Sequence, residues 1–345
     1  MGKVDYADIS ERLIQGYKEK LFVKQQNTLI EKQRNLGSLI ATSNFGANLL
    51  NLLKTISKYE DHNAQQICLD SIDLEKIYKG VDDRMETPEI VNEIELGYSD
   101  YLVKEVLKWY KEFFFEWVNQ PKTTEDQGEA RLIKIERSNL KEQQEGSANV
   151  TEIYVTSKTN EIIRFPRYND PIFLLNWKKG RCGEWNNCFC LILRSLGLRI
   201  RYIWNKEDHV WCEYYSTSLK TWIHLDCCEN SFNEPLLYNK GWNKKMSYCI
   251  AFGMDGIKDV SFKYVNIEKN SLPRDQISES ELCKIIKYCN SDLKKFKNKD
   301  DLFQLHVEEN YEDYFYKQNN KILDDLKSRK SGDSSWTKER GEDGN

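Results

Sequence analysis

A cysteine in the middle of the chain has the surroundings of a nucleophile. Cys182 lies in the stretch GRCGEW, residues 180–185, directly before an apolar segment. Large apolar residues recur there at helical spacing until Gly197, which supplies a stop, so a buried helix is predicted to begin at or just after Cys182. Unpaired N–H groups and the helix dipole favour an anion at this position, which eases formation of the thiolate. On this stretch alone, a buried structural thiol explains the cysteine equally well.

Two partners for acid–base chemistry follow on predicted strands. Residues rich in β-branched and aromatic side chains predict strands over 200–204, 209–215 and 221–226, with residues 216–219 as a hairpin loop. This register places His209 directly opposite Asp226, with Cβ atoms roughly 4.5–5.5 Å apart, which suits a carboxylate that holds an imidazole. Cys182 would then attack, His209 would carry the proton and Asp226 would fix the imidazole tautomer.

The sequence around these residues closely resembles the peptide:N-glycanase family of the transglutaminase-like superfamily. The resemblance covers about residues 100–265 and is specific, because many blocks match at once. The blocks are FPRYNDP (165–171), GRCGEWNNCF (180–189), DHVW (208–211), LDCCEN (225–230), PLLY (235–238) and GWNKKMSY (241–248).

The resemblance implies a role for each matching position. Cys182 matches the nucleophile, His209 the general base and Asp226 the orienting acid. Four further positions match residues that support substrate handling or catalysis. Of these, Arg201 is expected to support the oxyanion site, whereas the expected substrate-binding residues are Trp211, Glu213 and Trp222. The aromatic segment 109–119 resembles the block that contributes an oxyanion-site tryptophan, and we favour Trp117 over Trp109 for that role.

The expected fold is α+β, with a transglutaminase-like or papain-like core. A helix that bears Cys182 would pack on an antiparallel sheet that bears His209 and Asp226. We expect a helical N-terminal extension over 1–97, the catalytic core over 98–265 and a helical region over 266–330. Residues 98–119 predict one helix with an aromatic stripe. Residues 331–345 are rich in Ser, Gly, Asp and Lys, which predicts a disordered tail.

Within the core, a lobe over about residues 120–160 departs from the family. The resemblance implies two Cys-x-x-Cys pairs there that bind a structural zinc. The matching places hold Thr123 and Asp126, then Thr156 and Thr159. Threonine hydroxyls are not ligands of such a site. We therefore expect no zinc, no metal site and no other cofactor, with the lobe held by its own packing.

Composition excludes several classes of function. Charged residues make up 31% of the chain but the net charge is only −4, which gives no broad basic surface for nucleic acid. The sequence has no apolar run of the roughly 18–20 residues that a membrane span needs. It also has no apolar signal-peptide segment, and its ten cysteines include no Cys-x-x-Cys pair. These features indicate a reducing compartment. We expect a cytoplasmic protein and leave a nuclear location open.

The expected activity is an amidase that releases N-linked glycans from misfolded glycoproteins and converts the asparagine to aspartate. The triad follows from the residues, whereas this substrate comes from the resemblance. A thiol protease or a transglutaminase with the same triad stays open, as does a non-catalytic adaptor for glycoproteins or the proteasome. Residues 278–297 and 308–330 form lysine-rich amphipathic segments. They would either pack on the core or, as the resemblance implies, dock a ubiquitin-receptor shuttle protein of the proteasome pathway.

Overall fold

The computed structural model describes residues 6–41, 43–123, 128–265, 268–318, 326 and 328–344, with side chains left out over 33–41. Its centre is a six-stranded antiparallel sheet in the order β11-β10-β9-β8-β12-β13. The strands are β8 (Ile200–Asn205), β9 (His209–Ser216), β10 (Thr221–Asp226), β11 (Ser231–Phe232), β12 (Cys249–Gly253) and β13 (Gly256–Asp259). The three strands predicted from sequence are β8, β9 and β10.

Helix α8 (Cys182–Ser195) packs against one face of this sheet. Its apolar side chains join those of alternate strand residues in the main core, such as Phe189, Tyr214 and Phe252, which are fully buried. The arrangement is the expected one, a helix that begins at Cys182 on a sheet that bears His209 and Asp226. The fold is therefore α+β, as predicted.

The opposite face of the sheet carries a second, aromatic core. Trp211 and Ile203 pack there with Tyr238, Trp242 and Tyr264, which come from the segments that follow β10. A short turn of π-helix (Leu237–Gly241) supplies Tyr238 and is followed directly by Trp242, and the short helix α9 (Ser261–Tyr264) supplies Tyr264. The alternation of side chains along β9 thus divides its residues between two buried layers.

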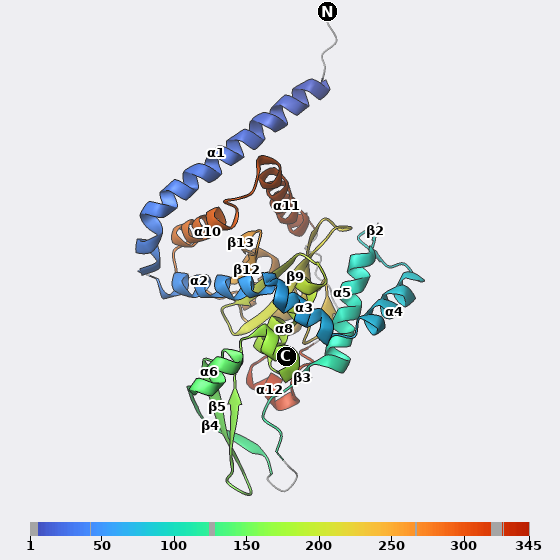
Figure 1. Ribbon diagram of the computed structural model, residues 1–345, viewed down its shortest axis with the longest axis vertical. Helices are drawn as coiled ribbons and strands as arrows, with labels where there is room; N and C mark the ends of the chain where they lie inside the picture. Colours follow the sequence, from blue (N-terminus) through green and yellow to red (C-terminus); the bar gives the residue numbers. More distant parts are fainter. Residues whose placement is uncertain are drawn as a thin grey trace, which may run out of the picture.

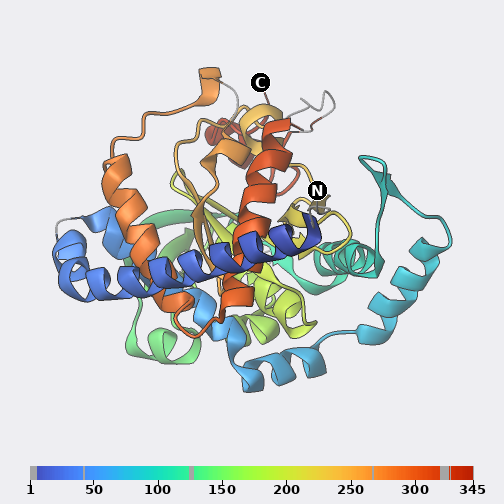
Figure 2. The ribbon, with the colours of Figure 1, turned by 90° about the horizontal axis from the view of Figure 1, so that it is seen from above.

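Helices from both ends of the chain cover the core. The long helix α1 lies across α10 and α11, so helices from the two ends of the sequence pack together, whereas the C-terminus itself lies near α12, away from the free end of α1 (Figures 1 and 2). The N-terminal helices are α1 (Tyr6–Ala41), α2 (Asn44–Ser57), α3 (His62–Ser71) and α4 (Leu74–Met85), with a 3-10 turn at Lys58–Glu60. The C-terminal ones are α10 (Glu279–Leu293), α11 (Lys299–Gln318) and α12 (Ser334–Glu339), with a 3-10 turn at Glu268–Asn270. None of the described helices combines the length and apolar character that crossing a membrane requires.

The aromatic segment predicted as one helix over 98–119 is shorter in the structure. Helix α5 (Tyr98–Trp109) continues only as a π-helical turn (Tyr110–Phe114), and the chain then extends into β3 (Glu116–Trp117). Strand β3 pairs in parallel with β7 (Lys179–Gly180), just before Cys182. Bulky aromatic residues favour an extended conformation. The helix therefore ends before Glu116, where the chain pairs with β7. Two further short strands, β1 (Ile90–Val91) and β2 (Ile94–Glu95), form a hairpin before α5.

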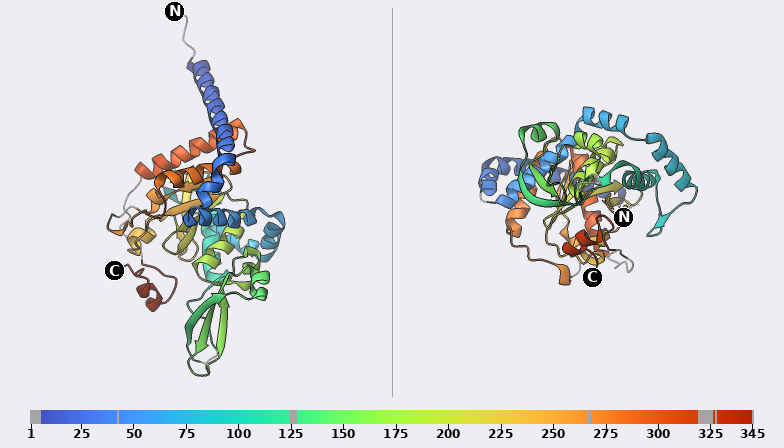
Figure 3. Two further views of the ribbon diagram at one scale, coloured as in Figure 1. Left: turned by 90° about the vertical axis from the view of Figure 1, so that its left-hand side faces the viewer. Right: turned by 90° about the horizontal axis from the view of Figure 1, so that it is seen from below.

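The predicted lobe is a three-stranded antiparallel sheet that projects from the core (Figure 3, left). Its strands are β4 (Ala130–Arg137), β5 (Val150–Thr156) and β6 (Ile162–Pro166), with α6 (Leu140–Gly146) between the first two. Helix α7 (Pro171–Trp177) then leads from the lobe to β7 and α8. The lobe therefore connects directly to the helix that bears Cys182.

The prediction of a disordered tail is wrong for the described part of that segment. Helix α12 begins at an Asp333 cap whose carboxylate accepts the N–H of Trp336 at 2.8 Å, and Glu342 is fully buried. The polar composition suggested disorder because the segment has few apolar side chains to bury. Its charged residues instead find partners of opposite charge on the core, such as Lys244.

Candidate active site

The Cys182 thiol stands at the first residue of α8, as the sequence predicts. Arg181 precedes it in an extended conformation, and its N–H donates to the Glu184 carboxylate at 3.0 Å. Gly180 is required by close packing, because a Cβ atom there would come within 2.5 Å of the Glu184 side chain. Gly183 is different, since a Cβ there would meet no atom within 4 Å. The main chain before Cys182 is therefore tightly packed at Gly180, whereas the main chain after it has free space at Gly183.

A network of buried charges ties the start of α8 to the lobe. The Arg181 guanidinium donates to both oxygens of Glu152 at 2.7 Å and to the carbonyl of Val118 at 3.1 Å. Arg167 donates to both oxygens of Glu184, at 2.6 and 2.9 Å. Strand β5, strand β3 and helix α8 are therefore fastened together around the thiol. The network joins the FPRYNDP block, through Arg167, to the GRCGEW block, through Glu184, a link that the sequence alone did not reveal.

His209 and Asp226 lie together in the interior. His209 begins β9, and its Nε2 is 3.1 Å from Oδ2 of Asp226, the last residue of β10. The other carboxylate oxygen accepts the N–H groups of Cys228 at 2.8 Å and Glu229 at 3.2 Å. Burial alone would raise the pKa of Asp226, but the His209 hydrogen bond and charge outweigh it and hold that pKa well below its usual range. The carboxylate stays ionised and fixed.

The thiol and the imidazole interact as a pair. Nδ1 of His209 is buried and makes no hydrogen bond of ordinary length and angle within the described residues, which leaves it available to the thiol. Burial would raise the pKa of Cys182, but the hydrogen bond and charge of His209, together with the charge of Arg329, lower it overall. Burial would lower the pKa of His209, but Asp226 and Cys182 raise it overall. Both shifts favour a thiolate–imidazolium pair.

The side chain of Asn186 helps to hold this geometry. It projects from the first turn of α8 and donates to the carbonyl of Trp211 on β9 at 2.9 Å. The helix that bears the thiol is therefore bonded to the strand that bears the imidazole. Such a link between buried polar groups is costly to break, because both partners would be left unsatisfied.

The predicted strand register is wrong by two residues. The structure pairs Trp222 with Tyr215 and His224 with Glu213, and the loop is residues 217–220 rather than 216–219. Ser216 stays in the strand because its hydroxyl accepts the N–H of Leu219, and Lys220 takes a positive φ of 53°. A slip of two residues leaves every side chain on its predicted face. His209 and Asp226 therefore still meet, but diagonally.

The residues expected to bind substrate, Trp211, Glu213 and Trp222, are buried in this structure, and their role toward substrate stays a prediction. Their exposed fractions are 1%, 0% and 3%. Trp211 lies under the His209 ring, with ring centres 5.6 Å apart. In this structure these side chains pack in the interior beneath the catalytic residues, as Trp211 does against the His209 ring. Alternation along a strand identified their shared face correctly but could not show that this face is covered.

Arg201 belongs to a buried ion cluster. Its guanidinium donates to Glu213 at 3.3 Å and to Glu312 of α11 at 2.8 Å, and stacks 3.8 Å from the Trp222 ring centre. Lys263 donates to the same Glu213 at 2.7 Å. The cluster fastens α11 to the sheet. The contacts of Arg201 in this structure are those of the cluster, and the predicted oxyanion support stays a prediction.

Trp117 lies beside the thiol-bearing segment, as predicted, through the pairing of β3 with β7. It is opposite Gly180, and its ring centre is 6.4 Å from that of Trp185 on α8. Its indole N–H donates to Asn119 Oδ1 at 2.6 Å. Trp109, the alternative that we disfavoured, is buried against Phe114, with ring centres 4.7 Å apart.

A hydrogen-bond relay behind Asp226 was missed by the sequence analysis. The Tyr238 hydroxyl donates to Asp226 Oδ2 at 2.9 Å and lies 2.7 Å from His224 Nε2. His224 Nδ1 in turn accepts the N–H of Glu234 at 3.2 Å. Burial lowers the pKa of His224 to about 3, so this ring is neutral and carries its proton on Nε2. Tyr238 is the last residue of the PLLY block, so the match of this block to the family was the sequence feature that could have pointed to it.

The threonines at the places where the resemblance implies zinc ligands do not fit a zinc ion. The hydroxyls of Thr156 and Thr159 lie 2.7 Å apart and bond to each other, and that of Thr123 bonds to the Gly128 carbonyl. Asp126 lies outside the described residues. Among the described residues, one group of three potential ligands comes together, formed by Asp226, Cys227 and Cys228. Asp226 there is already held by His209.

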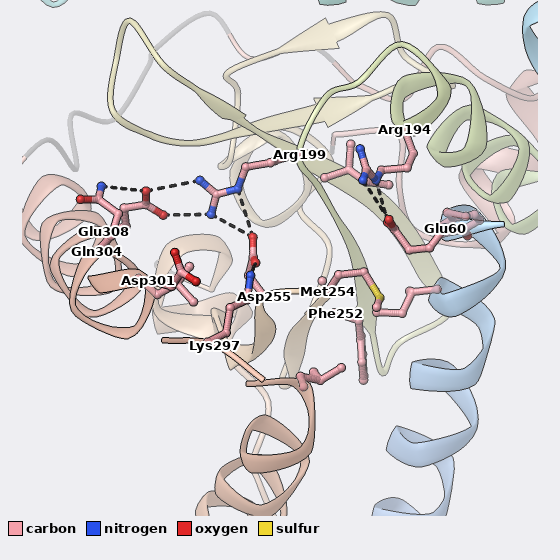
Figure 4. Close-up of a pocket in the computed structure, with 16 residues that line it drawn as sticks. Glu60, Arg194, Arg199, Phe252, Met254, Asp255, Lys297, Asp301, Gln304 and Glu308 are labelled. Atoms are coloured by element: carbon pink, nitrogen blue, oxygen red, sulfur yellow. Dashed lines mark hydrogen bonds and ion pairs between the residues drawn. The ribbon is translucent and has the colours of Figure 1, made fainter. Parts of the chain in front are cut away.

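Two hollows in the surface differ in their relation to the triad. A groove of about 630 Å³ is lined by aromatic rings, including Trp117 and Trp185, together with Cys228 and Ser331. A pocket of about 550 Å³ lies elsewhere, between Arg194 and Glu308 (Figure 4). Its labelled arginines are ion-paired with carboxylates and none of its lining residues belongs to the triad. The groove has no triad residue in its lining either, but Trp117 pairs with the segment that leads to Cys182, and the N–H of Cys228 is bonded to Asp226, so the lining of the groove is joined to the triad.

Comparison with known proteins places these features in a family context. A model of the transglutaminase-like superfamily matches residues 135–227, and a model of the Rad4 transglutaminase-like domain matches residues 202–333. The peptide-N(4)-(N-acetyl-beta-glucosaminyl)asparagine amidase of Kluyveromyces lactis is 41% identical over 98% of each chain. The protein of that name from Saccharomyces cerevisiae is 38% identical over 99% of this chain and 97% of its own. The one from Candida glabrata is 40% identical over 96% and 94%.

Proposed function

This chain belongs to the peptide-N(4)-(N-acetyl-beta-glucosaminyl)asparagine amidase family, and we propose that Cys182, His209 and Asp226 carry out its reaction. It is a hydrolase that acts on amide bonds and has a cysteine-based, transglutaminase-like core. The observation that carries the assignment is the arrangement around His209. Asp226 holds one ring nitrogen, and the other is left for a thiol at a helix N-terminus.

The reaction begins with attack of the Cys182 thiolate on the side-chain carbonyl carbon of a glycosylated asparagine. The C–N bond breaks, the imidazolium of His209 gives its proton to the departing nitrogen, and the glycan leaves as a glycosylamine. A thioester remains on Cys182. His209 then takes a proton from water, the resulting hydroxide attacks the thioester, and aspartate and the free thiol are formed. Asp226 keeps the imidazole in one orientation through both steps.

Charge on the carbonyl oxygen during attack needs donors in front of the thiol. The main-chain N–H of Cys182, the first residue of α8, is one donor, supported by the helix dipole. We assign the Trp117 indole as the second donor. This role requires the indole to leave Asn119, to which it donates at 2.6 Å in the structure.

We propose that the substrates are misfolded N-glycoproteins, encountered in the cytoplasm or nucleus. The names of the relatives support an N-linked glycan on asparagine as the group removed. Ten unpaired cysteines, eight of them buried, suit a reducing compartment. Delivery would involve a ubiquitin-receptor shuttle protein and the proteasome. Exposed apolar side chains on the N-terminal helix, such as Tyr6 and Leu13, support a docking role, whereas α10 and α11 pack on α1 and the core.

We also propose that the chain needs no zinc or other cofactor. The mutual bonds of Thr156 and Thr159 take over the position of one ligand pair. The purified protein should hold less than one zinc per ten chains by metal analysis, an order of magnitude that separates a trace from a site that contributes to folding. A chelator should leave its melting temperature and activity unchanged. One bound zinc per chain, with loss of stability on its removal, would overturn this proposal.

Mass spectrometry of a denatured N-glycoprotein tests the proposed function. The wild-type protein should remove the whole glycan and convert asparagine to aspartate, whereas Cys182→Ala should leave the glycoprotein intact. Cys283→Ala is the matched control, because Cys283 is an exposed cysteine outside the site. Peptide-bond cleavage or isopeptide formation in place of glycan release would identify a protease or a transglutaminase. An unreactive Cys182 thiol in folded protein would identify a non-catalytic adaptor.

A further inference from the structure

The C-terminal segment, residues 328–344, lies over the catalytic residues instead of trailing into solvent. Helix α12 sits beside β3 and the start of α8 (Figure 1), and its Trp336 ring is 6.4 Å from that of Trp117. We propose that this segment is a lid that blocks the active site and must move away before a glycoprotein can reach Cys182. The inference rests on the proposed function, because it takes Cys182 as the reacting group.

The lid is fastened first at Glu229, three residues after Asp226. The buried Glu229 carboxylate accepts the main-chain N–H groups of Lys330 at 2.7 Å and Ser331 at 3.0 Å, and the Ser331 hydroxyl as well. The N–H of Glu229 itself donates to Asp226 at 3.2 Å. Glu229 therefore links the lid to Asp226, the carboxylate that holds His209.

Arg329 is the lid residue whose charge acts on the Cys182 thiol. Its guanidinium is buried 5.2 Å from the ring centre of Trp117 and 4.9 Å from that of Trp242. Trp117 pairs with the segment that leads to Cys182, and the Trp242 ring is 5.1 Å from the His209 ring. A flat cation therefore fills the space between the two rings that flank the catalytic pair. A substrate amide that approaches Cys182 from this side must displace it.

Glu342 closes the other end of the lid. This fully buried carboxylate is ion-paired with Arg329 and Arg340, and with Lys244 of the core at 2.5 Å. Arg340 in turn donates to the carboxylate and the carbonyl of Asp208, both at 2.9 Å. Asp208 directly precedes His209. The lid therefore contacts the core on both sides of the catalytic pair, with Glu342 at the junction.

The lid also narrows the groove whose lining is joined to the triad. Residues 330–332 form one wall of the aromatic groove, next to Cys228. A substrate with a glycan on one side and a polypeptide on the other needs space on both sides of Cys182, and the closed lid occupies part of that space. A protein that binds only in its open form loses apparent affinity in proportion to the fraction of time it is closed. Weakening the lid should therefore raise activity.

Two full-length variants test this. Glu342→Gln removes the shared anion and leaves Arg329 unpaired, whereas Arg340→Ala removes the contacts with Asp208 and one ion pair of Glu342 but keeps Arg329 paired. Because one unpaired buried charge strongly disfavours the closed form, kcat/KM for an N-glycopeptide should rise about tenfold in Glu342→Gln and a few-fold in Arg340→Ala. Lys338→Ala is the matched control, since Lys338 is exposed on α12, and should equal the wild type.

A second readout does not depend on glycan release. The limiting alkylation rate of Cys182 at high pH is measured with iodoacetamide and with a bulky haloacetamide. The ratio of bulky to small reagent should rise in both lid variants. Unchanged or lower values of kcat/KM and of this ratio, in variants with an intact melting transition, would overturn the lid and make the segment a fixed wall of the site. If no variant releases glycan but the ratio rises, the lid stands and the proposed function fails.

Discussion

The imidazole of His209 and the carboxylate of Asp226 meet 3.1 Å apart although they are not opposite each other on neighbouring strands. Asp226 ends β10 two positions away from the residue that would face His209. Each side chain reaches diagonally across the sheet, and the turn after Asp226 fixes the carboxylate with two N–H groups. The orientation of the imidazole therefore depends on this turn as much as on the strands.

Asp226→Asn should remove most of the activity without unfolding the protein. The amide can no longer stabilise the imidazolium or fix its tautomer, and loss of the orienting acid in comparable triads lowers kcat by about 10³–10⁴. Steady-state kinetics on an N-glycopeptide, alongside circular dichroism, measures this. A loss of less than about tenfold would mean that the contact is structural only.

Tyr238→Phe should lower kcat by about five- to tenfold, because one net hydrogen bond to the Asp226 carboxylate is worth about 1–1.5 kcal/mol. Tyr264→Phe is the matched control, since its buried hydroxyl donates to Glu213 at 2.6 Å, outside the triad. Both variants should lose similar stability, but only Tyr238→Phe should lose activity. Equal activities in the two variants would remove Tyr238 from the positioning role.

The pH dependence of thiol alkylation should report the ion pair. The pKa of Cys182 lies below its ordinary 9.0 because the effects of His209 and Arg329 exceed that of burial. The thiolate therefore persists at pH values where a free thiol is protonated, and it is lost as pH falls through the lowered pKa. In His209→Ala, only Arg329 still opposes the effect of burial, so the pKa of Cys182 should rise. The midpoint of the iodoacetamide rate should then move to higher pH. An unmoved midpoint would show that His209 does not interact with the thiol.

Arg201→Met should destabilise the fold by about 3–5 kcal/mol, because Glu213 and Glu312 would then face each other buried and with less compensating charge. Arg201→Lys should recover only part of this, since it loses the flat stacking on Trp222. Urea unfolding measures both effects. Activity per folded molecule should stay near that of the wild type. A loss of activity in a variant that keeps full stability would show that Arg201 takes part in catalysis.

Local patterns were sufficient to predict the chemical centre. The spacing of apolar residues places Cys182 at a helix start, and strand alternation places His209 and Asp226 on one face, so an error of two residues in register did no harm. Contacts between distant segments were not predictable. Arg329 reaches the thiol from 147 positions along the chain, and Trp211 is buried because later segments cover its face. Neither fact has a local sequence signature.

The most direct test of the central claim is hydrolysis of an N-glycopeptide in water enriched in heavy oxygen. If Cys182 forms a thioester that water resolves, the released peptide must contain aspartate with one heavy oxygen atom in its side chain, and Cys182→Ala must yield no product. Peptide mass spectrometry resolves the label. Release of the glycan with asparagine retained, or with no heavy oxygen in the peptide, would show that the amide bond is not the one cleaved and would contradict the account.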